Sequence, residues 1–104
     1  MASLLVWMEQ DPGKEQSVPM IARRAGRSTR TLSRRFREQI GETPARWVTG
    51  ARVRRARRLL ETTALSVDRV AADAGFGSPA MLRERFGRLV GTSPQTYRRS
   101  FRAV

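Results

Sequence analysis

Residues 17–47 read SVPMIARRAGRSTRTLSRRFREQIGETPARW, and residues 66–97 read SVDRVAADAGFGSPAMLRERFGRLVGTSPQTY. The two stretches agree at apolar, capping and turn positions, with an offset of 49 residues at the start of the pattern and 50 at its end. The offset changes between Gly75 and Ser78, where the second copy has one extra residue. The same small structural unit therefore occurs twice in the chain.

Each copy predicts two helices joined by a tight turn. Ser17 and Ser66 suit the N-cap of a first helix, and apolar residues follow at helical spacing. Gly26 and Gly75 stand where that helix is expected to end in a left-handed residue. The serines expected to cap the second helices are Ser28 and Ser78. Two short helices joined by a glycine-containing turn are typical of the helix-turn-helix motif.

Three further helices are expected outside the two units. A threonine–proline pair at residues 43–44 begins a long connecting helix that reaches about Glu61. A serine–proline pair at residues 93–94 begins a last helix, and residues 4–8 form a short first helix that a loop at residues 11–13 ends. The prediction is an all-α fold of seven helices without a sheet, in which a long connecting helix joins two helix-turn-helix units.

The predicted organisation is one compact domain with three parts. Residues 1–48 hold the first unit and its N-terminal helix, residues 44–62 form the connecting helix, and residues 63–104 hold the second unit. The chain has 104 residues, 39% of them hydrophobic, which is enough for a modest core.

The composition excludes much of enzyme and metal chemistry. The chain has no cysteine, which removes disulfides, thiolate nucleophiles and cysteine-type zinc sites. It also has no histidine, the usual general base near neutral pH and the commonest metal ligand. We therefore expect no enzymatic activity, no metal and no cofactor. No apolar run approaches the roughly 20 residues of a membrane span, and the expected location is the cytoplasm.

The charge of the chain indicates a polyanionic partner. The net charge is +12, the isoelectric point is about 11.9, and 20 of the 21 basic residues are arginines. A strongly basic soluble domain most often binds nucleic acid, and an anionic membrane surface is the second candidate. The alternative is that the arginines only face solvent and bind no partner, because a GC-rich genome favours arginine codons over lysine codons.

The second helix of the first unit has one polar face opposite an apolar stripe. Its Arg30, Ser33, Arg34 and Arg37 follow helical spacing, and the opposite stripe is read as core. The polar face is either a solvated surface or a recognition surface for the DNA major groove, where arginine contacts guanine O6 and N7. At the N-terminus of this helix, serine and threonine are expected to donate to phosphate, helped by the helix dipole. Those residues are Ser28 and Thr29.

The corresponding face of the second unit is less basic. Ala80 or Met81 would contact a thymine methyl group, Arg83 a guanine, and Glu84 would accept from cytosine N4. A purely structural pair between Glu84 and Arg88 is an equal alternative, because the carboxylate would repel phosphate. The first unit is therefore expected to supply more of the affinity and specificity. The residues expected to contact phosphate are Ser28, Thr29, Arg37, Ser78 and Arg88.

The connecting helix and the two aromatic positions that follow a proline are interpreted mainly as structural. The arginines at residues 52–58 cover more than one helix face, and some are expected to pair with Glu61 or Asp73. Phosphate contact by others stays an alternative, and base reading is not assigned to them. Trp47 and Tyr97 occupy equivalent repeat positions, where packing inside each unit is preferred to base stacking on single strands.

Taken together, the sequence resembles the DNA-binding domain of the AraC/XylS family of bacterial transcription regulators, over about residues 3–102. The resemblance rests on the two units, on RVRRARRLLE in the connecting helix, and on GFGSPAMLRERFGRLVGTSPQTYRRSF near the end. It implies that the two second helices enter successive major grooves on one face of the DNA, and that RNA polymerase is activated. The base-facing positions that it implies are Arg30, Ser33 and Arg34 in the first unit and Pro79, Ala80, Met81 and Glu84 in the second.

Two features set this sequence apart within that resemblance. Many members have arginine where Glu84 stands, which puts a strong guanine contact by the second unit in doubt. The C-terminal pattern is similar to the subgroup whose N-terminal domain resembles class I glutamine amidotransferases. We expect a fragment of a longer regulator, with a small stand-alone member as the alternative. A fragment without the effector-binding and dimerising domain would be mainly monomeric.

The main alternative from another functional class is a nonspecific nucleoid-associated or RNA-binding protein driven by charge alone. Its affinity would depend steeply on salt and would show no preferred site. A membrane-active or adaptor helical protein is the third hypothesis, which binding to liposomes without binding to DNA would favour.

Overall fold

The computed structural model describes residues 2–10 and 17–102, which form seven α-helices and no strand. The helices are α1 (Ala2–Gln10), α2 (Val18–Arg24), α3 (Thr29–Ile40), α4 (Pro44–Thr62), α5 (Val67–Ala74), α6 (Pro79–Val90) and α7 (Pro94–Arg102). The predicted all-α class, the helix count and the long connecting helix are confirmed, whereas the loop expected at residues 11–13 lies outside the described residues. None of the described helices combines the length and apolar character that a membrane span needs.

A hydroxyl side chain begins each helix from α2 onward. In each case its oxygen accepts a hydrogen bond from the backbone N–H three residues later, over N–O distances between 3.1 and 3.3 Å. The capping residues are Ser17, Ser28, Thr43, Ser66, Ser78 and Ser93. These bonds satisfy donors that have no partner within a helix, so the capping prediction is confirmed.

Left-handed glycines end the paired helices in both units. Gly26 and Gly75, after the first helix of each unit, have φ angles of 68° and 93°, as predicted. Gly41 and Gly91 repeat the conformation after the second helices, with φ angles of 90° and 88°. Only glycine adopts this conformation without steric cost, so the sharp turns of both units depend on these four positions.

Adding one methyl group is expected to have opposite effects at two glycines of this fold. A Cβ at either Gly41 or Gly87 would meet no atom within 4 Å, so neither substitution creates a clash. Gly41→Ala is expected to destabilise the protein by about 1–2 kcal/mol because alanine disfavours a positive φ. Gly87→Ala, inside α6, is expected to stabilise it by about 0.5–1 kcal/mol. Urea unfolding of both variants tests this difference, and an equal effect at the two sites would contradict it.

The helix α4 divides the molecule into two lobes with separate cores. Trp47, Val48 and Ala51 of α4 pack with buried residues of α1, α2 and α3. Val53, Ala56 and Leu60 pack with buried residues of α5 and α6 and the partly buried Tyr97 of α7. At 100° per residue these two sets lie on opposite faces of α4, which therefore belongs to both cores. The molecule is elongated, measuring 45 × 22 × 22 Å along its principal axes.

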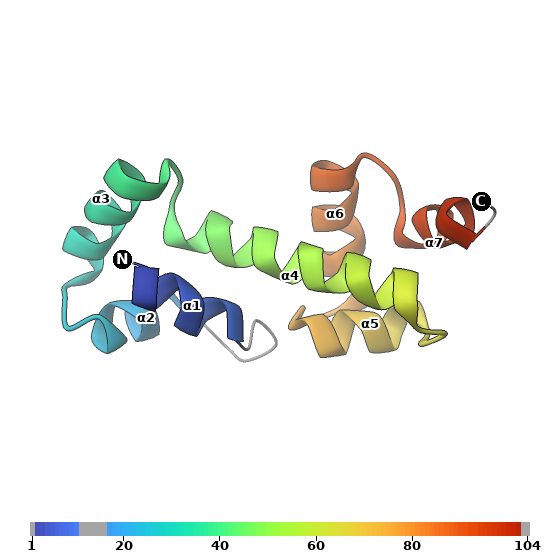
Figure 1. Cartoon of the computed structure of the whole chain (residues 1–104), viewed down its shortest axis with the longest axis horizontal. Coiled ribbons are helices and arrows are strands. Elements are labelled where there is room, and N and C mark those ends of the chain that lie inside the picture. Colours follow the sequence, from blue (N-terminus) through green and yellow to red (C-terminus); the bar gives the residue numbers. More distant parts are fainter. Residues whose placement is uncertain (1, 11–16, 103–104) are drawn as a thin grey trace.

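The second helices of the two units stand on the same side of α4, as Figure 1 shows, while α2 and α5 lie on the other side. Leu32 and Phe36 hold α3 in place, and Leu82 and Phe86 do the same for α6; all four are fully buried. The predicted inward stripe of α3 is confirmed at Leu32 and Phe36, and Ile40 at its end is partly buried against the same core. The repeat thus places two equivalent helices on one side of α4, one after the other along the long axis (Figure 1).

Candidate nucleic-acid interface

The outward face of α3 is strongly basic. Arg30, Arg34 and Arg37 are exposed, and Ser33 between them is half-buried. Within the part of the chain that the structure describes, these three arginines make no ion pair and no side-chain hydrogen bond. Three guanidinium groups are therefore available to a ligand along one helix face.

The hydroxyl at the N-terminus of α3 already takes part in the helix cap. Ser28 accepts from the N–H of Thr31 at 3.1 Å and donates to Thr31 Oγ1 at 2.9 Å. Ser78 occupies the same place in the second unit and accepts from the N–H of Met81 at 3.1 Å. Thr29 follows Ser28 and is exposed. The cap leaves the first backbone N–H groups of α3 pointing outward as donors for an anion.

The outward face of α6 is largely neutralised by its own ion pairs. Ala80, Met81, Arg83 and Glu84 are exposed, and Pro79 is half-buried. Arg83 lies 3.8 Å from the carboxylate of Asp68 on α5. The residues of α6 that the sequence predicts to contact bases therefore lie on its outward face, and the charged ones among them are engaged in ion pairs.

The carboxylate of Glu84 is paired with two arginines of its own helix. It forms ion pairs and hydrogen bonds with Arg85 and with Arg88. The hydrogen bond from Arg85 lowers the pKa of Glu84 most, and the positive charges of both arginines lower it further. The pair between Glu84 and Arg88, one of the two alternatives for this position, is present in the structure.

The two aromatic residues after the prolines pack inside their units. The Trp47 ring is buried and meets Phe36 edge to face, with ring centres 6.3 Å apart. The Tyr97 ring meets Phe86 in the same way, with ring centres 5.5 Å apart. Packing is therefore confirmed for both rings, and the guanidinium groups of Arg54 and Arg57 lie 5.7 and 5.3 Å from the ring centres of Trp47 and Tyr97.

Arginine contacts join α7 to the end of α4. Arg98 donates to the carbonyl oxygens of Leu60 and Thr63 at 3.2 and 3.3 Å. Partial burial lowers the pKa of Arg98, and the charge of Arg102 adds to this effect. These bonds satisfy carbonyls at the C-terminus of α4, where a cation is also favoured by the helix dipole.

Arg55 and Arg57 of α4 donate hydrogen bonds to groups other than the carboxylates that the sequence suggested. Arg55 donates to the backbone carbonyl of Asp73 at 3.0 Å, whereas the carboxylate of Asp73 pairs with Arg69. Arg57 donates to the hydroxyl of Tyr97 at 3.4 Å, and that hydroxyl donates to Glu61. The hydrogen bond to Tyr97 is the main reason that the pKa of Arg57 is raised. The hydroxyl of Tyr97 therefore bridges Arg57 and Glu61. The expected contact between α4 and Asp73 is present, but Arg55 binds the backbone carbonyl of Asp73 and not its carboxylate.

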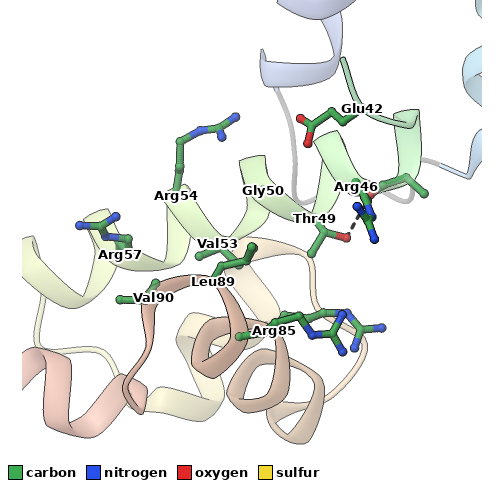
Figure 2. A pocket seen from close by; sticks show the side chains of 12 residues that line it. Glu42, Arg46, Thr49, Gly50, Val53, Arg54, Arg57, Arg85, Leu89 and Val90 are labelled. Atoms are coloured by element: carbon green, nitrogen blue, oxygen red, sulfur yellow. Dashed lines mark hydrogen bonds between the residues drawn. The ribbon is translucent and has the colours of Figure 1, made fainter. Parts of the chain in front are cut away.

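A notch between α4 and α6 gathers further arginines (Figure 2). Its volume is about 670 Å³. The lining residues are Glu42, Ala45, Arg46, Thr49, Gly50, Val53, Arg54, Arg57, Arg85, Arg88, Leu89 and Val90. Arg46 and Arg85 were not predictable as site residues from the sequence, because they come from separate helices whose approach depends on the tertiary fold. For Arg85, the available signal was its position on the helical wheel of α6, beside the face that is expected to read bases.

Comparisons with known proteins agree with this architecture. A family model described as a helix-turn-helix domain matches residues 21–100. The solved DNA-binding domain of AdpA, a global transcriptional factor in complex with a target DNA, is 43% identical with a TM-score of 0.95. The match covers 98% of this chain and 92% of that one. An AraC-type DNA-binding domain regulator from Chromobacterium violaceum is 26% identical with a TM-score of 0.88, over 96% of this chain and 89% of that chain. This chain belongs to the AraC family of helix-turn-helix transcription regulators.

Longer relatives contain a region that is similar to this chain. A helix-turn-helix transcriptional regulator of Mycobacterium tuberculosis is 40% identical over 89 residues, which are 86% of this chain and 34% of the relative. The regulator GlxA of Rhizobium meliloti, which has a glutamine amidotransferase-like domain, is 42% identical over 79 residues, 76% of this chain and 24% of the relative. The chain thus spans about a quarter to a third of these relatives, and the subgroup resemblance is supported.

Proposed function

We propose that this AraC-type domain binds double-stranded DNA at specific sequences for a bacterial transcription regulator, with α3 and α6 in successive major grooves. The observation that carries the proposal is the placement of the two helices on one side of α4 with three unpaired arginines along α3. Its similarity to a domain solved with its target DNA supports the same function. Half-sites about one helical turn apart fit two equivalent helices on one face.

In the first unit, α3 reads bases and holds phosphate. Arg30 and Arg34 contact guanine O6 and N7, and Ser33 contacts either kind of base. Arg37, further along the same face, contacts a phosphate. The N-terminus of α3 holds a second phosphate through backbone N–H groups, with Ser28 and Thr29 as the nearest hydroxyls. This unit supplies most of the affinity.

In the second unit, α6 recognises the bases of its half-site through shape and apolar contacts more than through charge. Pro79, Ala80 and Met81 form a small apolar surface that fits thymine methyl groups. Arg83 contacts guanine when it leaves Asp68, a weak partner at 3.8 Å. Glu84 accepts from cytosine N4 only if one of its two arginine pairs opens. Ser78 and Arg88 contact phosphate in this unit.

Selection from random duplex DNA tests the proposed function. After several rounds, the bound fraction is expected to contain a two-part motif whose halves lie about one helical turn apart, with the stronger half assigned to α3. A bound fraction without any enriched motif would favour a nonspecific nucleoid or RNA-binding protein, whose binding depends on charge alone.

Further properties of the whole regulator belong to the same proposal. We infer contact with RNA polymerase, a location in the bacterial cytoplasm and no enzymatic activity. We also infer that the chain is monomeric by itself, because the dimerising domain would lie elsewhere in the regulator. Residues 1–48, 44–62 and 63–104 remain the proposed division into first unit, connecting helix and second unit.

Replacing Glu84 with glutamine is expected to increase affinity for duplexes of any sequence. The change removes a negative charge from the face of α6 and releases Arg85 and Arg88 from their ion pairs. Because Arg88 already contacts phosphate in the proposed complex, a new phosphate contact by Arg85 steepens the slope of log K against log salt by about 0.9. Any preference for cytosine that depends on Glu84 is lost at the same time.

The matched control for Glu84→Gln is Glu38→Gln, which removes one exposed carboxylate from α3. Titration at several salt concentrations, with the selected site and a random duplex, measures both variants. If Glu84→Gln gives the same slope as Glu38→Gln, Arg85 is not held back by Glu84.

A further inference from the structure

The notch between α4 and α6 is a strongly cationic concave surface. Five arginines line it, and Glu42 is the one carboxylate among the lining residues. Figure 2 shows Arg46, Arg54 and Arg57 along α4 and Arg85 on α6, with Arg46 and Arg85 toward the same end of the notch. An anionic ligand with more than one charged group fits such an arrangement better than a neutral ligand does.

The arginines of the notch differ in how strongly other groups hold them. Arg54 and Arg57 lie over aromatic rings, and Arg85 belongs to the ion pairs of Glu84. Arg46 is exposed, and the structure of residues 17–102 gives its side chain no ion pair and no hydrogen bond. Arg46 can therefore bind an anion without breaking an existing contact, and it is the residue on which a test should centre.

The place of the notch in the fold indicates which anion reaches it. Its lining comes from α4 between Ala45 and Arg57, from the second half of α6, and from Glu42 in the turn between α3 and α4. If α3 and α6 occupy successive major grooves, the minor groove of the DNA between the half-sites must pass the gap between these two helices. Arg46 on α4 and Arg85 on α6 line the two helices that form the notch, so each helix presents an arginine to a strand that borders this groove.

We propose that the notch binds the sugar–phosphate strands bordering the minor groove between the two half-sites, so that a narrow groove there strengthens binding. The proposal rests on the proposed function, because it requires α3 and α6 in successive major grooves. A narrow minor groove, as in A-tracts, brings its two strands together and deepens its negative potential, which attracts arginine. The protein thereby acquires specificity for the spacer without contact to base edges.

A protein partner is the alternative to DNA as the occupant of this notch. The notch has apolar residues beside its arginines, among them Leu89, which is 56% exposed, so an acidic protein segment is the competing occupant. Bound DNA would cover the gap between α3 and α6 and leave such a segment no access. The two occupants are therefore separated by whether removal of Arg46 changes DNA binding.

The test uses the selected half-sites with two spacers of equal length, one an A-tract and the other rich in G and C. The unmodified chain is expected to bind the A-tract duplex several-fold more tightly. Arg46→Ala is expected to reduce this preference and to make the salt slope shallower by about 0.9, while base preferences inside the half-sites stay unchanged. Arg58→Ala removes an exposed arginine of the same helix outside the notch and serves as the matched control.

Circular dichroism first checks that both variants are folded. Equal affinity of the unmodified chain for the two spacers would overturn the proposal, and so would an Arg46→Ala variant that binds both duplexes as Arg58→Ala does. The second result would leave the notch to an acidic protein segment. In both cases selective binding to the half-sites would persist, whereas a failure of the proposed function would remove selectivity from every duplex.

Discussion

Replacing Arg34 with alanine is expected to weaken binding to the selected DNA site by about 1–3 kcal/mol, or roughly 5- to 150-fold, and to relax the preference at one base pair. Arg34 lies in the middle of the basic face of α3, one helical turn after Arg30 and three residues before Arg37. It is exposed and makes no ion pair or side-chain hydrogen bond with any described residue, so its loss removes contacts to the DNA and leaves no carboxylate unpaired.

The size of this effect follows from the geometry of a guanidinium group. Two parallel N–H donors match the O6 and N7 acceptors of guanine, and no other base pair presents this pattern at the same place in the major groove. A contact to phosphate would weaken all duplexes by the same factor. Binding measured with a set of duplexes that differ at single base pairs separates the two roles.

Arg34→Lys is the control that keeps the charge. Lysine retains the attraction to the duplex but has no planar fork, so the salt slope should stay close to that of the unmodified chain while discrimination falls. If Arg34→Ala weakens the selected site and random duplexes equally, Arg34 does not read a base.

The repeat made most of this surface predictable from the sequence. Leu32 and Phe36 recur as Leu82 and Phe86, and a buried stripe on each helix determines which residues face outward. Helical spacing then places Arg30, Arg34 and Arg37 together without knowledge of the rest of the fold. Local periodicity was sufficient here because the recognition face of a helix is defined by the helix itself.

The partners of the remaining charges were not predictable in the same way. Helical spacing allowed Glu84 to pair with Arg88 but could not decide between that pair and an open carboxylate, and the contact with Arg85 was not anticipated. Arg55 contacts the backbone of Asp73 because α4 and α5 approach each other in the tertiary structure. The notch around Arg46 depends on the same kind of packing between distant segments, on which single-helix patterns give no information.

A second large effect is expected when the phenylalanine at the centre of either core is replaced with alanine. Phe36 and Phe86 are fully buried at equivalent positions of the repeat. Each removal leaves a cavity, and the expected loss of stability is about 3–5 kcal/mol, a large part of the total for a domain of this size. The edge-to-face contacts with Trp47 and Tyr97 are lost at the same time.

The two substitutions should act on different halves of the molecule. The cores lie on opposite faces of α4, and α4 is the helix that contributes buried residues to both. Phe36→Ala is therefore expected to reduce amide protection in α2 and α3 while α5 and α6 remain protected, and Phe86→Ala is expected to do the reverse. Hydrogen exchange followed along the chain measures this distribution, and each variant is the control for the other.

DNA binding gives the division between the two cores a functional consequence. With α3 disordered, the Phe36→Ala variant loses the three free arginines and should lose most of its affinity, whereas Phe86→Ala should keep weak binding to the half-site of α3. Nuclease footprints of the two variants on the selected site test this asymmetry. If either substitution removes protection from all helices together, α4 transmits unfolding between the cores and the lobes form one cooperative unit. In that case both variants would lose the whole footprint, because neither recognition helix would persist without the other.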